Sequence, residues 1–270
     1  MLITSFMSRS LSKLRSLSKP DFPEIFKPTE NDIYLVSYPR SGNTWMRVIM
    51  AELLYKKSGE SVADIQYYVP DIHRKTYAKD VINSEFNLIK SHHLYRKDFK
   101  QVTNYKKVIY LIRDPRDVVI SYYKYKKILR GYPLGFDEFF LDWISGRIWP
   151  CSWQEHINSW VGLGSQNSGV ELEIIRYEDL LVNPEPELLK LGKILGIQIL
   201  SEDVQRAIQA AAVDKMRSKE SKGMPEHERS DKFQFIGEAT NKQWTEKLTS
   251  EQLNLIHEYL GATMKHHGYS

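Results

Sequence analysis

Four short apolar runs divide the chain at intervals that predict alternating strands and helices. The strand-like runs fall at about 33–38, 86–91, 107–113 and 171–176. Other stretches have the length and pattern of helices, at 43–57, 115–130, 136–146, 153–163, 185–195, 201–213 and 249–265. Strands that alternate with helices are typical of a parallel sheet. We therefore expect an α/β fold with a central parallel β-sheet flanked by helices, and ligands at the carboxyl ends of its strands.

The sequence YPRSGNTW, directly after the first apolar run, predicts a tight turn that leads into a helix. Gly42 lets the backbone come close to a ligand, and the N–H groups of the helix start near Asn43 attract anions. Arg40 can donate two hydrogen bonds to an anion, and the hydroxyls of Ser41 and Thr44 can each donate one. The triphosphate motif G-x-x-x-x-G-K-[ST] is absent from the sequence. The turn is either ordinary α/β construction or a site for a phosphate-like group other than that of ATP.

A second turn of this kind follows the third apolar run. Asp114 is a natural helix N-cap, and Pro115 suits the first helical position. Arg113 then lies at the carboxyl end of a strand, and Ser121 lies about two turns into the helix. If both residues meet one ligand, that ligand lies along the flank of the helix. The alternative is that Arg113 pairs with a neighbouring aspartate and Ser121 is a solvated hydroxyl.

Two further segments complete a set of four. Lys90-Ser91-His92 closes the second apolar run, and Tyr177 follows the fourth within the sequence IRYEDL. In this order and spacing, the four segments resemble those of the cytosolic-type sulfotransferase family. The resemblance implies a P-loop-NTPase-like three-layer sandwich. It also implies the donor 3′-phosphoadenosine 5′-phosphosulfate (PAPS), the product adenosine 3′,5′-bisphosphate (PAP), and no metal.

The resemblance implies a cofactor site that draws on several parts of the chain. The first turn would hold the 5′-phosphosulfate, and Arg113 and Ser121 would hold the 3′-phosphate. Aromatic side chains at a helix start and a strand end would stack on or edge the adenine. The cofactor-binding residues implied in this way are Arg40, Ser41, Gly42, Asn43, Thr44, Trp45, Arg113, Ser121, Tyr177, Val213 and Gly237.

The catalytic residues that the resemblance implies are His92, Lys90 and Arg40. Sulfuryl transfer, like phosphoryl transfer, needs an in-line nucleophile, a stabilised leaving group and neutralisation of charge. Arg40 and Lys90 would stabilise charge on the leaving oxygens, and a neutral His92 would take the proton of the acceptor. Neighbouring residues on a strand point to opposite faces, so His92 and His93 are not expected to share a metal ion.

The chain departs from the family pattern at two places. Arg40 stands where the family usually has lysine, which keeps the charge but puts it on a bulkier planar group. Phe235 and Ile236 stand where the family has an Arg-Lys pair for the 3′-phosphate. Arg229 or Lys232 is then a candidate substitute for that pair.

Composition limits the partners and the cellular compartment that we expect for the protein. A formal net charge of +4 over 270 residues suits a polyanionic cofactor without requiring nucleic acid as a partner. The single cysteine, Cys151, excludes an intramolecular disulfide and is typical of a reducing compartment, so we expect a cytoplasmic protein. No apolar run reaches the roughly 18 to 20 residues of a spanning helix, so stable membrane insertion is not expected.

The first thirty residues differ from the rest of the chain. Up to Lys19 they carry four basic residues, six serines and no acid. Such a stretch is typical of an organellar transit peptide, a weak interfacial helix or a loosely packed basic terminus. We expect residues 1–30 to form a basic lead-in and residues 31–270 to form a single sulfotransferase domain.

The acceptor is expected to contact the three loops at 67–80, 131–149 and 223–241, which are rich in aromatic and apolar residues. This composition favours a small lipophilic or phenolic acceptor with a hydroxyl, or an amine, although a sugar also stacks on aromatic rings. Two other classes stay open: a non-catalytic PAP/PAPS-binding protein, and a nucleotide kinase, for which no lysine-bearing triphosphate loop is visible. We expect a monomer or a homodimer.

Overall fold

The sheet consists of four parallel strands in the order β2-β1-β3-β4. The computed structural model describes residues 31–73, 87–95, 105–165, 169–223 and 241–270. Within them the strands are β1 Ile33–Ser37, β2 Leu88–Ser91, β3 Lys107–Ile112 and β4 Glu171–Arg176. Each strand lies inside one of the four apolar runs, so the predicted parallel sheet is confirmed.

Helices follow the strands in the rhythm that the sequence predicts. The longer ones are α2 Asn43–Tyr55, α4 Pro115–Leu129, α5 Phe136–Ile144, α6 Trp153–Ser165, α8 Pro184–Leu195, α9 Ser201–Ala210, α10 Val213–Gly223 and α12 Ser250–His266. The short ones are α3 Ile65–Tyr68, α7 Tyr177–Val182 and α11 Trp244–Lys247.

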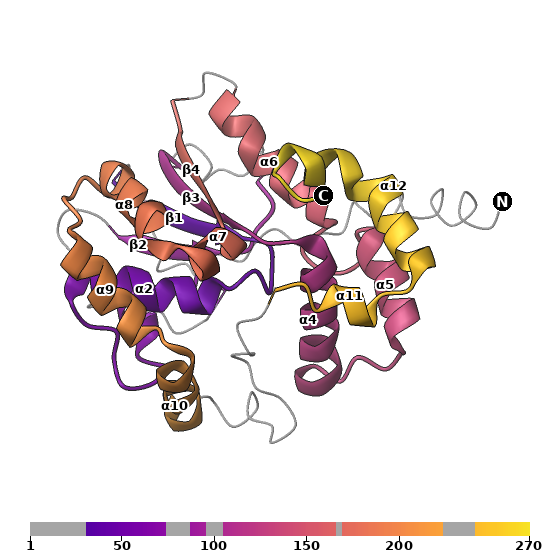
Figure 1. Ribbon diagram of the computed structural model, residues 1–270, viewed down its shortest axis with the longest axis horizontal. Helices are drawn as coiled ribbons and strands as arrows, with labels where there is room; N and C mark the ends of the chain where they lie inside the picture. Colours follow the sequence, from indigo (N-terminus) through magenta and orange to yellow (C-terminus); the bar gives the residue numbers. More distant parts are fainter. Residues whose placement is uncertain (1–30, 74–86, 96–104, 166–168, 224–240) are drawn as a thin grey trace.

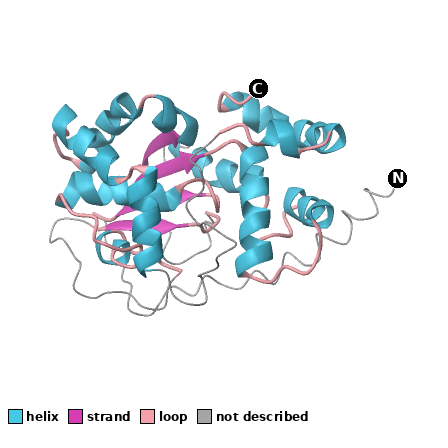
Figure 2. Ribbon diagram, turned by 60° about the horizontal axis from the view of Figure 1, so that its bottom comes forward, coloured by secondary structure: helices cyan, strands magenta, loops and turns pink. Residues whose placement is uncertain are grey.

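Both faces of the sheet are buried, which explains why the strands are apolar throughout. Successive side chains of a strand point to opposite faces. Tyr34 and Val36 accordingly pack in one core with residues of α4, α5, α6 and α12. Ile33 and Leu35 pack in a second core with residues of α2, α8 and α9. Figures 1 and 2 show the resulting helix, sheet and helix layers, which confirm the predicted three-layer arrangement.

One predicted helix is wrong at its end. The sequence pattern suggests a helix over 201–213, but α9 ends at Ala210 and Val213 starts a separate helix, α10. The break has a tertiary cause, because the carbonyl of Ala211 accepts a hydrogen bond from Trp45 Nε1 at 2.9 Å. That contact with a distant helix fixes the turn, and local periodicity does not report it.

An extended segment outside the named strands lengthens the sheet at its β2 edge. Lys90 N–H donates to the carbonyl of Pro70 at 2.8 Å, and Ile72 N–H donates to the carbonyl of Lys90 at 3.2 Å. Asp71 thereby pairs with Lys90 in a parallel bridge. The sequence pattern places this segment in an acceptor loop, so its position beside β2 is a finding of the structure.

In the described part of the chain, none of the helices combines the length and the apolar character that crossing a membrane requires.

Candidate active site

The turn between β1 and α2 is built for close approach to a ligand. Gly42 caps the helix with a φ of 92°, and Arg40 also takes a left-handed φ of 71°. Ser41 is fully buried, and its hydroxyl makes no hydrogen bond among the described residues. A buried hydroxyl without a partner costs free energy, and a phosphate oxygen is a suitable acceptor for it. Asn43 starts the helix, and Thr44 follows it half-buried at the first turn.

Gly42 has a second role that its sequence context does not reveal. A Cβ atom at this position would lie 2.6 Å from a ring carbon of Tyr177. The ring of Tyr177 also meets the ring of Trp45 edge-on, with centroids 5.6 Å apart. Gly42 therefore serves the packing of Tyr177 against the turn, in addition to the backbone conformation. Val213 lies half-buried two residues after Ala211, which accepts the hydrogen bond from Trp45.

The turn after β1 is in direct contact with the turn after β3. Arg40 Nε donates to Ser121 Oγ at 3.2 Å, and Arg113 Nη1 donates to the carbonyl of Arg40 at 3.3 Å. The Arg113 guanidinium lies over the ring of Tyr177, 4.3 Å from its centroid. The turns after β1 and β3, helix α4 and the start of α7 thus meet at the carboxyl ends of the strands, and Ser121 and Arg113 both contact Arg40.

The N-terminus of α4 is capped as predicted, and its first turn also binds the backbone of the segment before α11. Asp114 accepts from the backbone N–H of Arg116 at 2.9 Å, and Pro115 is the first helical residue. Asp117 accepts from the backbone N–H groups of Lys242 and Trp244 at 2.7 and 3.1 Å. The segment that precedes α11 is therefore fixed beside the end of β3. Gly237 and its candidate neighbours Arg229, Lys232, Phe235 and Ile236 lie outside the described residues.

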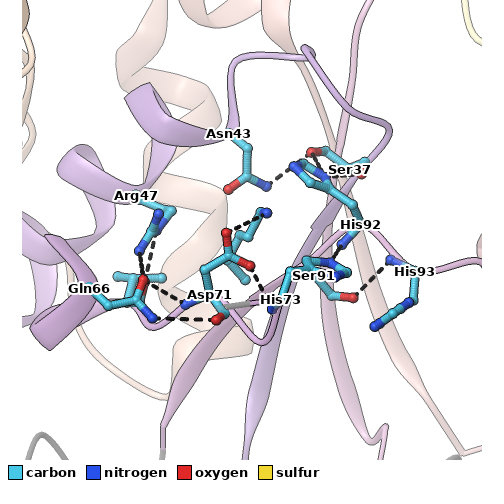
Figure 3. A network of polar contacts seen from close by, with 11 residues as sticks. Ser37, Asn43, Arg47, Gln66, Asp71, His73, Ser91, His92 and His93 are labelled. Carbon is cyan, nitrogen blue, oxygen red and sulfur yellow. Dashed lines mark hydrogen bonds and ion pairs between the residues drawn. The ribbon is translucent and has the colours of Figure 1, made fainter. Parts of the chain in front are cut away.

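His92 lies just after β2, and its ring is held in one tautomer. Its Nδ1 is 2.7 Å from the carbonyl of Ser37 and must donate there, which leaves the lone pair on Nε2. The hydroxyl of Ser37 in turn accepts from Asn43 Nδ2 at 3.0 Å, so the ring is tied to the start of α2. Burial and the nearby Lys90 ammonium hold the pKa of His92 well below its usual range. The imidazole is therefore neutral at pH 7. Figure 3 shows His92, Ser37 and Asn43 in this arrangement.

Lys90 is buried two residues before His92 and forms an ion pair with Asp71, at 2.8 Å between Nζ and Oδ2. Burial opposes the negative charge of Asp71, but Lys90 outweighs it and holds the pKa of the carboxyl well below its usual range. His73 accepts the backbone N–H of His92 on its Nε2 at 2.8 Å. Sequence reasoning missed both Asp71 and His73. The signal that could have found them is the lysine inside an apolar strand, because a buried ammonium needs a carboxylate partner.

A third histidine supports the backbone of His92 from the α6 side. His156 Nε2 donates to the carbonyl of His92 at 3.2 Å, and its Nδ1 accepts from the Tyr110 hydroxyl at 2.7 Å. Burial lowers the pKa of His156 to about 3, so it stays neutral. Burial likewise lowers the pKa of His93 to about 4, and its ring lies 4.3 Å from that of His73. Among the described residues, no group of three or more His, Cys, Asp or Glu is placed to hold a metal ion.

Comparisons with known proteins agree on the family. The model of the sulfotransferase domain matches residues 30–268. Among curated relatives, rat sulfotransferase 1E1 is 30% identical over 72% of this chain and 69% of its own. A rabbit amine sulfotransferase is 24% identical over 77% and 69%. A guinea-pig 3-beta-hydroxysteroid sulfotransferase is 23% identical over 84% and 81%.

Solved structures show the same fold. A mouse sulfotransferase in complex with PAP has a TM-score of 0.67 at 19% identity, over 90% of each chain. A retinol dehydratase in complex with retinol and PAP has a TM-score of 0.72 at 16% identity, over 91% of this chain and 84% of its own. With the domain match over nearly the whole chain, the protein belongs to the sulfotransferase family, whose members are PAPS-dependent transferases.

Proposed function

We propose that this chain transfers the sulfonate of PAPS to a hydroxyl, or an amine, of a small lipophilic or phenolic acceptor, with His92 as the base. The observation that carries the proposal is the neutral imidazole of His92, whose Nδ1–H is bound to Ser37 beside the turn that starts α2. A fixed tautomer with a lone pair on Nε2 is what proton removal from an acceptor requires.

The residues of the turn fit the donor. The buried hydroxyl of Ser41, which has no hydrogen-bond partner within the described ranges, and the start of α2 suit a phosphate or sulfonate oxygen. We assign the 5′-phosphosulfate to Arg40 through Thr44 and the 3′-phosphate to Arg113 and Ser121. Trp45, Tyr177 and Val213 are assigned to the adenine, and Gly237 to the cofactor-binding turn near the 3′-phosphate. When bound, PAPS supplies the activated sulfonate that is transferred.

The side chains of this protein then have distinct tasks. His92 accepts the proton of the acceptor at Nε2. Lys90 and Arg40 hold positive charge next to the turn, where a leaving phosphate would gain negative charge. The carbonyl and hydroxyl of Ser37, together with Asn43, keep the imidazole in the orientation that this proton transfer needs.

The class of the acceptor is inferred from the relatives and from the residues near His92. Two of the curated relatives are named for amine and 3-beta-hydroxysteroid substrates, which are small molecules. Trp149 is 41% exposed, and its ring lies 6.3 Å from that of His92. An exposed aromatic ring beside the base supports a flat, apolar acceptor. We further propose that residues 31–270 act as one domain, as a monomer or a homodimer in the cytoplasm.

The proposal is tested first by calorimetric titration with PAP, with ATP and magnesium as the control. Transfer from PAPS is then measured with 2-naphthol, a 3β-hydroxysteroid and a primary amine as acceptors. We expect micromolar or tighter binding of PAP, little response to ATP, and transfer to at least one acceptor. Binding of PAP without transfer to any of them would favour a non-catalytic PAP-binding protein, and a preference for ATP would favour a nucleotide kinase.

A further inference from the structure

The extended segment beside β2, residues 70–73, touches both residues that we assign to the transfer step. It is joined to β2 by two backbone hydrogen bonds through Lys90, of 2.8 and 3.2 Å. Two of its side chains then reach the neighbouring catalytic positions, Asp71 to Lys90 and His73 to His92. One short segment therefore holds two residues that lie on β2 and just after it.

The pair of Lys90 and Asp71 is buried on both sides. The side chains keep only 8% and 12% of their exposed area, and 2.8 Å separates Nζ from Oδ2. A buried ammonium without a counter-charge loses its proton more readily, because burial disfavours the charged form. Asp71 also accepts the backbone N–H of His73 on its other oxygen, at 2.9 Å. The carboxylate is thus fixed at both oxygens.

His73 acts on the backbone of the base and not on its ring. Its Nε2 accepts the N–H of His92 at 2.8 Å, while His156 donates to the carbonyl of the same residue at 3.2 Å. The peptide units on both sides of His92 are therefore held by imidazole groups from two different parts of the chain. Burial lowers the pKa of His73 to about 2, so this acceptor stays available over the whole working pH range.

We propose that Asp71 and His73 are positioning residues of the transfer centre: Asp71 keeps the Lys90 ammonium charged and oriented, and His73 fixes the backbone that carries His92. The inference rests on the proposed roles of Lys90 and His92. It assigns neither Asp71 nor His73 a contact with the acceptor.

The charge of Lys90 depends on all the groups packed around it. Besides Asp71, the ionisable side chains around Lys90 come from α2, from the 70–73 segment and from the residues just after β2. They are Arg47, His73, His92 and His93. Arg47 also donates to the carbonyl of Val69 at 2.8 Å and to Gln66 at 3.0 Å, which anchors the start of the segment. Figure 3 shows Arg47, Gln66, Asp71 and His73 in this network. Of these five described side chains Asp71 is the one carboxylate, and its replacement by asparagine removes the negative charge that lies 2.8 Å from Lys90 Nζ.

The first experiment measures the charge of Lys90 directly. Protein labelled with ¹³C-lysine is titrated by NMR between pH 7 and 11 in the parent and in Asp71→Asn, with the Lys90 signal assigned from Lys90→Arg. Asparagine keeps the shape of the side chain and removes its charge. We expect the Lys90 titration to move to lower pH by about one to two pH units in the variant, because burial then acts without the negative charge of Asp71.

The second experiment links this charge to turnover. The rate of transfer from PAPS to 2-naphthol is followed over the same pH range. In Asp71→Asn the alkaline fall in kcat should begin at lower pH, by about the same shift as in the NMR titration. In the double variant Asp71→Asn with Lys90→Arg, the alkaline limb should move back up, to the pH of the parent or above it, because a guanidinium stays charged. A merely structural role of Asp71 would lower kcat equally at all pH values.

The role of His73 is tested with a matched pair of variants. His73→Phe keeps a ring but removes the acceptor, whereas His73→Gln places an amide oxygen near the position of Nε2. We expect His73→Phe to lower kcat roughly tenfold with little change in KM, since small misplacement of a base slows proton transfer strongly. His73→Gln should recover most of the loss.

The outcomes separate this inference from the proposed function. An unchanged Lys90 titration in Asp71→Asn, or equal losses in His73→Phe and His73→Gln, would overturn the inference although the parent still transfers sulfonate. If the parent itself transfers nothing but binds PAP, the proposed function fails. The NMR titration still decides whether Asp71 sets the charge of Lys90.

Discussion

Two groups of cations flank the start of α2, and their neighbours differ. On the α4 side, Arg113 lies 4.3 Å from the centre of the Tyr177 ring, and Arg40 donates to Ser121 at 3.2 Å. On the β2 side, Lys90 lies 2.8 Å from the carboxylate of Asp71. Lys90 is thus held by a carboxylate at hydrogen-bond distance. The guanidinium groups on the α4 side lie against a ring face and a hydroxyl, and carboxylates also act on them electrostatically: Asp117 and Glu178 on Arg113, and Glu220 on Arg40. From the proposed roles, we expect the α4 side, which holds Arg113 and Ser121, to determine affinity for an anionic cofactor, and the β2 side, which holds His92, to determine turnover.

The largest expected effect is that of His92→Ala on turnover. Loss of a general base typically costs about 10²- to 10⁴-fold in rate. We expect the affinity for PAP to stay near that of the parent, because His92 belongs to the β2 side. Steady-state kinetics with 2-naphthol and calorimetry with PAP measure the two quantities. His257→Ala, at an exposed position of α12, is the control for loss of a histidine without a role in transfer.

Arg113→Ala should have the opposite pattern. We expect PAP binding to weaken about 10- to 100-fold, because hydrogen bonds to charged groups contribute about 1.5–3 kcal/mol. Turnover at saturating PAPS should change less than affinity. Arg113→Lys keeps the charge but loses the planar guanidinium. Its affinity for PAP should lie between that of the parent and that of Arg113→Ala. If His92→Ala and Arg113→Ala lose PAP affinity equally, the division between the two sides is wrong.

Gly42→Ala should lower the stability of the protein, because the added methyl group would collide with the ring of Tyr177. The substitution combines a φ of 92° with a contact of 2.6 Å to the Tyr177 ring. Gly131 has a φ of 61°, and a Cβ added there would meet no described atom within 4 Å, so Gly131→Ala isolates the cost of the backbone. We expect each variant to lose about 1–3 kcal/mol of unfolding free energy from backbone strain, with an added loss in Gly42→Ala. Urea denaturation of both variants measures the difference, and equal losses would show that the ring moves aside without cost.

The most gradual effect is the loss of stability with falling pH that we expect from His73, His93 and His156, which all lie on the β2 side. The pKa of His156 is about 3 in the folded protein, below its value of about 6.5 when unfolded. The unfolded state therefore binds more protons as the pH falls below about 6.5, and stability is lost on the way down to pH 3. The slope for His156 alone is about 1.4 kcal/mol per pH unit.

Urea denaturation at pH 7.5, 6.5 and 5.5 checks this slope. His156→Gln should flatten it, and His257→Gln is the control for loss of a histidine at an exposed position. His73 and His93, whose pKa values burial lowers to about 2 and about 4, add to the slope in the same direction. No change in slope in His156→Gln would show that His156 titrates normally in the folded state.

The sequence predicted the elements and the meeting of distant motifs well, because both follow from local patterns. Apolar runs located all four described strands, and parallel strands bring their carboxyl ends together. The contact between Arg40 and Ser121 follows from this rule, although the two residues are 81 positions apart. The roles of the site residues toward a cofactor stay predictions.

The rest of the site could not be predicted, because it depends on register and packing between segments. Asp71 reaches Lys90 only through the bridge at the edge of β2, and no motif marks residues 70–73. The contact of Gly42 with Tyr177 likewise depends on how β4 and α7 sit against the first turn. Local patterns also joined α9 to Val213, where a hydrogen bond from Trp45 to Ala211 breaks the helix.

The buried position of the single cysteine makes the protein suitable for site-specific labelling with thiol reagents. Cys151 is 2% exposed, and burial raises the pKa of its thiol, so it is a poor nucleophile in the folded state. Thiol-directed dyes and spin labels should therefore pass over the native chain. A cysteine introduced at an exposed position such as Ile128 of α4 would carry the label alone. Distances and motions around the α4 side can then be followed spectroscopically without first removing a native residue.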